Sequence, residues 1–153
     1  MFPTNGRSMN NSDVVQQCGR YGAYLGKFDS EEERSYIMKA TDQYSVKSAI
    51  WVDGYRENQC KKNWLDVFNI FQCTPTSTFI FKDPYSSSTP SSWLINNQWA
   101  DGQPDNSLNQ QNCTIMRVKC MADTCGRLDD IQCSYTGNTD TALVGYLCVR
   151  LAK

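Results

Sequence analysis

The sequence predicts an α+β domain held by disulfides, in which two helices come first and an antiparallel set of strands follows. Helical patterns occur only near the N-terminus, and strand patterns begin near residue 48. The chain has 153 residues and is 40% hydrophobic, which suffices for the core of one domain. Its eight cysteines are an even number and include no C-x-x-C pair. This spacing favours four disulfides over a zinc or redox site.

Two segments carry helix signals. Asp13 is a candidate N-cap for a short helix that runs through Arg20. Ser30 and Glu33 have the spacing of a capping box, which predicts a second helix over residues 31–43.

The first stretch of the chain is polar and turn-rich. We therefore expect a flexible tail over residues 1–13 and one domain over residues 14–153, without internal repeats or a linker.

Short runs of β-branched and aromatic residues predict the strands. Two polar segments between them predict loops, over residues 55–78 and 85–112. The second loop is long for a compact domain, and its Trp93 and Trp99 favour an ordered and functional segment. The predicted extended segments cover residues 24–28, 49–52, 79–81, 114–119, 128–133 and 145–151.

Composition excludes several classes of function. The formal net charge of −1 gives no long-range field for binding nucleic acid or an anionic membrane. Histidine is absent, which excludes histidine-activated nucleophiles and histidine metal sites. No activated nucleophile or tuned acid and base pair is visible, so we expect no enzymatic activity. The longest uncharged apolar run, Ala142 to Val149, is too short to insert through a bilayer.

The cysteines also predict a compartment. Four disulfides require an oxidising environment, so we expect a secreted or extracellular protein. Two N-glycosylation sequons, at Asn10 and Asn112, agree with the secretory route. No leader sequence opens the chain, and we expect that an exported precursor has already lost it.

Two acidic motifs are candidates for a metal site. Gln103-Pro104-Asp105 lies in the long predicted loop, and Asp129-Asp130 lies in the predicted strand over residues 128–133. Carboxylate and amide oxygens on two segments can converge on calcium, which accepts six to eight oxygen ligands in irregular geometry. The plainer interpretation is that both motifs are solvated turns, and spacing alone favours it.

The order of landmarks along the chain resembles a C-type lectin domain, particularly its invertebrate, nematode-like branch. The match runs from about residue 14 to 151. It consists of many ordered positions rather than one motif. These landmarks are Cys18, Gly22, Leu25, Ser30-Glu31-Glu32, Ile50-Trp51-Val52-Asp53-Gly54, Trp99, Gly102-Gln103-Pro104-Asp105, Asn112-Cys113, Gly126, Asp129-Asp130, Cys133 and Tyr146-Leu147-Cys148-Val149.

The resemblance implies a double-loop α+β fold with a long ligand-binding loop. It also implies the connectivity of the disulfides, which the sequence alone leaves open among 105 pairings. The implied pairs are Cys18–Cys148 and Cys113–Cys133, which leaves Cys60 for Cys73 and Cys120 for Cys125.

The family's Trp-Ile-Gly-Leu strand motif is present in altered form. An inserted aspartate, Asp53, shifts it.

In sugar-binding members of this family, one calcium ion is held by a Glu-Pro-Asn or Gln-Pro-Asp triplet, a later glutamate and an Asn-Asp pair. Here Gln111 replaces the glutamate, and Asp129 replaces the asparagine. The number of carboxylates is therefore still three. The resemblance implies Ca²⁺ as cofactor and a cis peptide bond before Pro104. The implied metal ligands are Gln103, Asp105, Gln111, Asp129 and Asp130, and the first four of them would also contact carbohydrate.

The resemblance implies a lectin that binds glycans through calcium, and a Gln-Pro-Asp triplet suggests galactose-type sugars. The aromatic residue on which galactose often stacks is replaced by Ser107, so Tyr135, Trp93 or Trp99 would have to take its place. The alternative is a protein-binding or structural module of the same fold, in which calcium only stabilises the loop or is absent. Both interpretations are compatible with association into oligomers.

Overall fold

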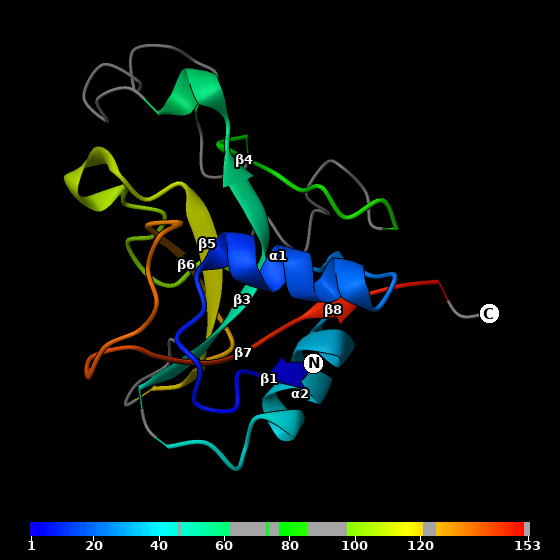
Figure 1. Ribbon diagram of the computed structural model, residues 1–153. Helices are drawn as coiled ribbons and strands as arrows, with labels where there is room; N and C mark the ends of the chain where they lie inside the picture. The colour runs from blue at the N-terminus through cyan, green and yellow to red at the C-terminus, as the bar shows by residue number, and fades with distance from the viewer. Residues whose placement is uncertain (46, 62–72, 74–76, 86–97, 121–124, 152–153) are drawn as a thin grey trace.

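The computed structural model describes residues 1–45, 47–61, 73, 77–85, 98–120 and 125–151. Two helices and two sheets are arranged around the long central strand β3 (Figure 1). In chain order the elements are β1 (Phe2–Pro3), α1 (Asn11–Arg20), β2 (Tyr24–Leu25), α2 (Glu31–Ala40), β3 (Ser48–Arg56), β4 (Phe79–Ile80), β5 (Cys113–Lys119), β6 (Leu128–Ile131), β7 (Ala142–Tyr146) and β8 (Cys148–Val149), with single 3-10 turns at Asn58–Cys60 and Ser107–Asn109.

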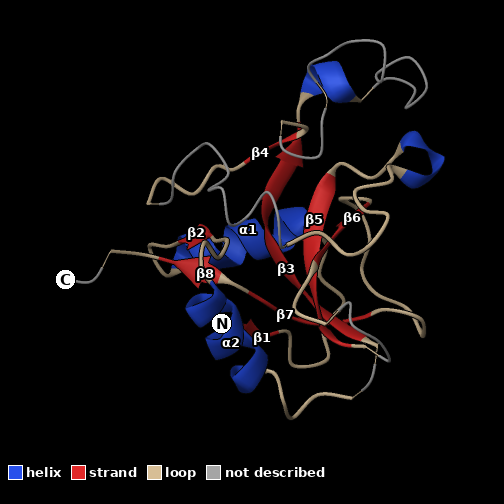
Figure 2. Cartoon of the chain, turned by 180° about the vertical axis from the view of Figure 1, so that it is seen from behind, coloured by secondary structure: helices blue, strands red, loops and turns tan. Residues whose placement is uncertain are grey.

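The larger sheet has the strand order β1-β7-β3-β5-β6, and β4 pairs with the end of β3. The sequence predicts antiparallel strands, but β3 and β7 are parallel. The last predicted strand is also divided. Its first part belongs to β7, whereas β8 pairs with β2 in a separate two-stranded sheet. Figure 2 shows this small sheet, beside the helices, from behind. The division follows from Leu147, whose backbone bonds both Trp51 of β3 and Gly26 after β2.

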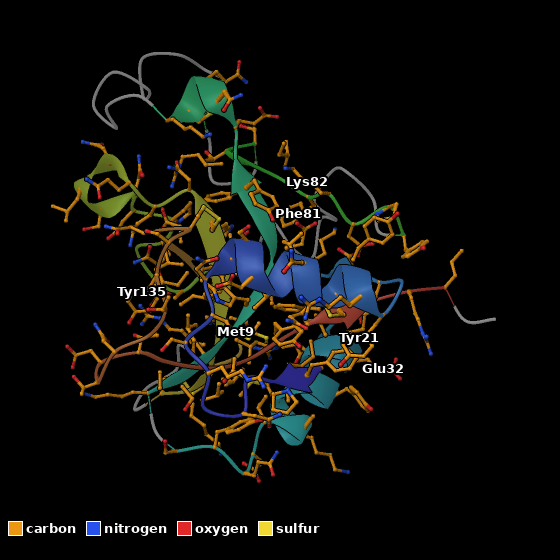
Figure 3. The ribbon with its side chains drawn as sticks, in the orientation of Figure 1. Met9, Tyr21, Glu32, Phe81, Lys82 and Tyr135 are labelled. Carbon is orange, nitrogen blue, oxygen red and sulfur yellow. A yellow bond between two sulfur atoms is a disulfide. The ribbon has the colours of Figure 1, made fainter. Side chains whose placement is uncertain are left out.

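The core lies on both faces of β3 because successive strand residues point to opposite faces. Ala49 and Trp51 face a cluster that includes Val14 and Cys18 of α1. Ile50 and Val52 face a second cluster, which includes Ile37 of α2. The fully buried indole of Trp51 donates its N–H to the backbone carbonyl of Met9. Met9 lies in the segment before α1 and is labelled in Figure 3.

The N-terminal residues differ from the predicted flexible tail. Phe2 and Pro3 pair with β7, and Thr4 and Met9 are buried. The Phe2 ring stacks on Tyr21 and on Tyr146 at centroid distances of 4.9 and 5.8 Å. These aromatic contacts involve partners that are distant in sequence, so the local polar composition does not reveal them. The boundary of the domain at residue 14 stays a prediction.

Both helices form where they were expected, with different ends. The N-cap of α1 is Asn10 rather than Asp13, because Asn10 and Asp13 exchange hydrogen bonds in a reciprocal capping box. Ser30 caps α2 through the N–H of Glu33. This helix ends at Ala40, three residues early, because the Thr41 hydroxyl donates to the carbonyls of the last turn.

Four disulfides join the chain in the pairing that the resemblance implies. Cys18–Cys148 links α1 to β8, and Cys113–Cys133 links the start of β5 to the segment after β6. Large parts of both predicted loops, including Trp93, lie outside the described residues. No helix in the described part of the chain has the length and apolarity needed to cross a membrane.

Candidate functional site

A β-bulge near the end of β3 positions the first residue of the site. The register of β3 against β5 shifts between Val52 and Tyr55, which leaves Asp53 and Gly54 as extra residues. Gly54 has φ +146°, and a Cβ there would meet the Thr114 hydroxyl oxygen at 2.5 Å. Only glycine therefore fits this close approach. Bulges redirect the side chains that follow them, and the residue redirected here is Arg56.

The bulge also fixes the segment after β4. The Asp53 carboxylate accepts backbone N–H groups of Gly54, Lys82 and Asp83 at 2.5 to 3.0 Å. Burial raises the pKa of Asp53, while these three hydrogen bonds oppose the rise. The inserted aspartate in the strand motif is thus a structural connection between β3 and the start of the long loop.

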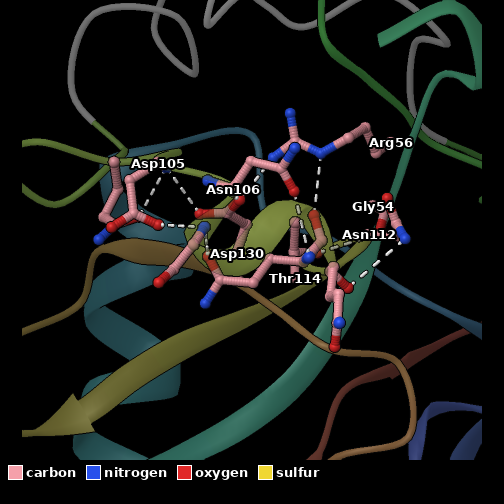
Figure 4. A network of polar contacts seen from close by, with 11 residues as sticks. Gly54, Arg56, Asp105, Asn106, Asn112, Thr114 and Asp130 are labelled. Carbon is pink, nitrogen blue, oxygen red and sulfur yellow. Dashed lines mark hydrogen bonds and ion pairs between the residues drawn. The ribbon is translucent and has the colours of Figure 1, made fainter. Parts of the chain in front are cut away.

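Arg56 and Asp130 form a buried ion pair at the centre of the site (Figure 4). A guanidinium nitrogen of Arg56 lies 2.5 Å from Asp130 Oδ2, and the exposed fractions of the two side chains are 1% and 0%. Arg56 Nε donates to the carbonyl of Gln111 at 2.9 Å. The guanidinium carbon also lies 4.7 Å from the centroid of the Phe79 ring. Arg56 therefore contacts β4, β6 and the segment before β5 at once.

Asp130 holds the loop of residues 103–111, which we call the 103–111 loop. Its Oδ1 accepts the N–H of Asp105 at 3.0 Å, and its Oδ2 accepts the N–H of Asn106 at 2.8 Å. Burial raises the pKa of Asp130 to about 6, while the charge of Arg56 and the two N–H groups oppose the rise. The ion pair with Arg56 requires the ionised form of Asp130.

The other polar side chains of the 103–111 loop bond the loop's own backbone. Gln103 Oε1 accepts the N–H of Asp105, and both Asp105 Oδ1 and Gln111 Oε1 accept the N–H of Ser107. Asn106 Oδ1 accepts the N–H of Gln111. The peptide bond between Gln103 and Pro104 is cis, as the resemblance implies. Asp105 is exposed, so one edge of this network faces solvent.

Asp129 belongs to a different environment although it adjoins Asp130. Successive residues of a strand point to opposite faces, and Asp129 lies opposite Ile115 while Asp130 lies opposite Thr114. The Asp129 carboxylate accepts two hydrogen bonds from the guanidinium of Arg117, at 3.0 and 2.5 Å. Burial raises the pKa of Asp129, and the hydrogen bonds and charge of Arg117 counteract the rise.

The five predicted metal ligands, as they are arranged, do not fit a calcium ion. Two arginines compensate two of the three carboxylates, and three donors already occupy the Asp130 carboxylate. The oxygens of Gln103 and Gln111 accept backbone N–H groups instead of facing a shared centre. Among the described residues, no group of three or more Asp, Glu, Cys or His side chains is placed to hold a metal ion.

Two buried side-chain atoms of the described network lack a hydrogen-bond partner, Asn106 Nδ2 and Asn112 Oδ1, and the first of them lies within the loop. Asn106 is 2% exposed, and its Nδ2 has no hydrogen-bond partner. As placed, this atom is a donor, so it favours an acceptor such as water or a hydroxyl oxygen over a cation. The structure thus joins Gln103, Asp105, Gln111 and Asp130 in one network, but the network is closed by arginine and backbone donors.

Two of the three predicted aromatic platforms, Tyr135 and Trp99, have other partners, and the third, Trp93, lies outside the described residues. The Tyr135 hydroxyl donates to the carbonyl of Thr141, and Trp99 packs against Phe79 at a centroid distance of 5.1 Å. The large apolar side chain at the tip is Leu108, which is 78% exposed and has φ +58°. A leucine in the left-handed region is unfavourable. Its neighbour Ser107 holds the position where an aromatic residue was expected.

Sequence reasoning missed Arg56, Arg117 and the buried Asn106. The available signal for Arg56 was its place two residues after Gly54, at the end of a buried strand. A charged residue there needs a buried partner of opposite sign. Asn106 follows the recognised triplet directly, and it has φ +48°, a conformation that asparagine tolerates better than most residues.

The family model described as "C-type lectin domain-containing protein 141/158" matches residues 2–151 of the chain. No curated protein sequence matches significantly. Among solved structures, the C-type lectin CEL-I from Cucumaria echinata is 18% identical with a TM-score of 0.57, and the match covers 83% of this chain and 77% of that one. The cow carbohydrate-recognition domain of CD23, solved in the presence of a GlcNAc2Man3 oligosaccharide, is 18% identical with a TM-score of 0.57, covering 95% and 82%.

A third match shows that the same fold occurs in a protein that is described as an antifreeze protein and not as a lectin. The herring type II antifreeze protein is 19% identical with a TM-score of 0.54, and the match covers 88% of this chain and 78% of that one. At these identities, the solved structures establish the fold and leave the ligand to the residues of the site.

Proposed function

Since the chain belongs to the C-type lectin domain family, we propose that it is an extracellular carbohydrate-binding domain that recognises glycans at the 103–111 loop. C-type lectin domains are non-enzymatic carbohydrate-binding modules. The observation that carries the proposal is that this loop is fixed from within by Asp130 while Asp105 stays exposed. A fixed loop binds without the entropic cost of ordering.

The exposed edge of the loop has the chemistry for sugar hydroxyls. Asp105 supplies a carboxylate acceptor, and Ser107 beside it is also exposed. Gln110 Oε1 accepts from Gln132 Nε2 at 3.1 Å, which adds amide groups from the segment after β6 to the same surface. Carboxylates accept from hydroxyls, while amides both donate and accept. We expect such a surface to bind vicinal hydroxyl groups.

The calcium-dependent, galactose-type form of this function stays a prediction. It requires Asp130 to exchange a guanidinium and two backbone N–H groups for an ion, and Asp129 to leave Arg117. The arrangement of the site favours glycan binding that needs no metal. An array of glycans read in calcium and again in EDTA separates the two forms. Retention on the same glycans in both buffers supports the metal-free form.

We predict that Asp105→Asn weakens glycan binding roughly ten- to hundredfold, because it removes a charged hydrogen-bond acceptor. Calorimetric titration with a glycan retained on the array measures the loss. Asp42→Asn is the matched control, since Asp42 is exposed and pairs with Lys119 at the opposite end of β5. Equal affinities of Asp105→Asn and the control would contradict the proposed position of the sugar.

The second candidate function is binding of a protein partner, and the exposed Leu108 favours it. An apolar side chain held in an unfavourable backbone conformation at a loop tip is suited to insertion into a partner's pocket. No retention on any glycan in either buffer would overturn the glycan proposal in favour of this one. Loss of partner binding in Leu108→Ser, with an unchanged melting temperature, would then locate the interface.

A further inference from the structure

The 103–111 loop depends on one buried carboxylate for its attachment to the sheet. Asp130 accepts the N–H groups of Asp105 and Asn106, which are consecutive residues at the turn of the loop. A buried carboxylate without a compensating charge is strongly unfavourable, so the ionised Asp130 that accepts these hydrogen bonds requires a cation beside it. The origin of that cation decides whether the loop needs a metal.

Arg56 meets this requirement from within the chain. Its guanidinium contacts Asp130 Oδ2, and its Nε donates to the carbonyl of Gln111 at the other end of the loop. Its backbone N–H donates to the carbonyl of Asn112. The same side chain therefore neutralises the carboxylate that holds residues 105 and 106 and bonds the end of the loop at residue 111.

The position of Arg56 makes this cation permanent. Its side chain is 1% exposed, it lies over the Phe79 ring, and the bulge at Asp53 and Gly54 directs it to β6. An arginine remains protonated in proteins, and a planar guanidinium matches the geometry of a carboxylate. Its charge, unlike that of a bound ion, does not depend on the concentration of any metal in the surroundings.

We propose that Arg56 is a built-in cation that attaches the 103–111 loop to β6, so that the loop is formed in the absence of calcium. This inference concerns the attachment of the loop, and it stands whether the loop binds a glycan or a protein. It differs from a merely stabilising ion pair, because it assigns to Arg56 the protection of two particular backbone N–H groups at Asp105 and Asn106.

The first experiment uses the unmodified protein. Amide hydrogen exchange is measured by NMR in EDTA and in about 10 mM CaCl2, roughly ten times above the weakest range of extracellular calcium sites. We expect the N–H groups of Asp105 and Asn106 to be protected equally in both buffers, and the melting temperature to be unchanged. Protection that appears only with calcium, or a melting temperature that calcium raises and EDTA lowers, would overturn the proposal.

The second experiment removes the cation. In Arg56→Gln, we expect the N–H groups of Asp105 and Asn106 to exchange as in an open loop, while β5 amides such as Ile115 stay protected to the level that global unfolding sets. Arg117→Gln is the matched control, because it makes the same substitution beside the neighbouring acid, and it should leave both loop amides protected. Loop protection in Arg56→Gln equal to that of the control would refute the role of Arg56. If Arg56→Gln does not fold, the comparison of buffers in the unmodified protein decides.

Discussion

Asp129 and Asp130 are adjacent on β6, and each is paired with an arginine, but the two ion pairs occupy different environments. The exposed side-chain fractions are 1% and 0% for Arg56 and Asp130, against 35% and 11% for Arg117 and Asp129. The buried pair also holds two backbone N–H groups of the 103–111 loop, whereas the other pair joins two neighbouring strands. The pair that shapes the loop is the one that water does not reach.

Burial changes the energetic consequence of losing one partner of an ion pair. Water and salt replace much of an exposed ion pair, so such pairs contribute little to stability. A buried charge that loses its partner keeps its full desolvation cost. The same substitution at Arg56 and at Arg117 should therefore lower the free energy of unfolding to different extents, severalfold more at Arg56. A series of variants measures the difference.

The largest effect is expected for Arg56→Gln. The substitution leaves Asp130 buried without a compensating charge, which we expect to lower the free energy of unfolding by about 3–5 kcal/mol. Urea denaturation followed by tryptophan fluorescence measures the change. A loss below about 1 kcal/mol would place Arg56 with the exposed pairs and remove the contrast between the two acids.

A smaller loss is expected when both charges are removed. In Arg56→Gln with Asp130→Asn, neither charge of this pair remains, and we expect the asparagine oxygen still to accept a backbone N–H. We expect the double variant to be more stable than Arg56→Gln alone, because an uncompensated charge costs more than an absent pair. Urea midpoints of the two single variants and the double variant give the coupling. Strict additivity would show that the two side chains act independently.

Phe79→Leu tests the apolar side of the buried pair. The Arg56 guanidinium carbon lies 4.7 Å from the Phe79 ring centroid, and we expect a loss of about 1–2 kcal/mol from this contact and from packing. Phe81→Leu is the control, since its ring lies 4.8 Å from Lys27 instead. Hydrogen exchange should show weaker protection of Asn106 in the first variant only. The same pattern in both would mean that the Phe79 ring does not support Arg56.

The sequence predicted much of this molecule because many of its signals are local or carried by ordered landmarks. Caps and polar–apolar patterns located both helices and most strands, and the landmark cysteines implied the four pairings. The parallel pairing of β3 with β7 was missed because strand direction depends on contacts between segments that are far apart in the chain. Phe2 was missed for the same reason, since its partners Tyr21 and Tyr146 are distant in sequence.

The candidate site divides in the same way. The triplet Gln103-Pro104-Asp105 and the acids of β6 were recognisable as motifs, and four of the five predicted side chains lie in one network. The cation beside Asp130 was not recognisable, because Arg56 lies 74 residues away in the chain and reaches Asp130 only through the bulge after Val52. Counting carboxylates suggested an ion, whereas the charge of that site is compensated by side chains from β3 and β5.

Arg117→Gln should give the smallest effect of the series. Arg117 is 35% exposed, so solvent screens its pair with Asp129, and we expect a loss of at most about 1 kcal/mol. Salt should also weaken the Arg117–Asp129 pair of the unmodified protein. The difference in stability between Arg117→Gln and the unmodified protein should therefore shrink from low to high NaCl, whereas the deficit of Arg56→Gln should persist. Urea midpoints at two salt concentrations measure both trends. If Arg117→Gln were as damaging as Arg56→Gln at high salt, burial would not be what separates the two acids, and the assignment of the loop to Arg56 alone would fail.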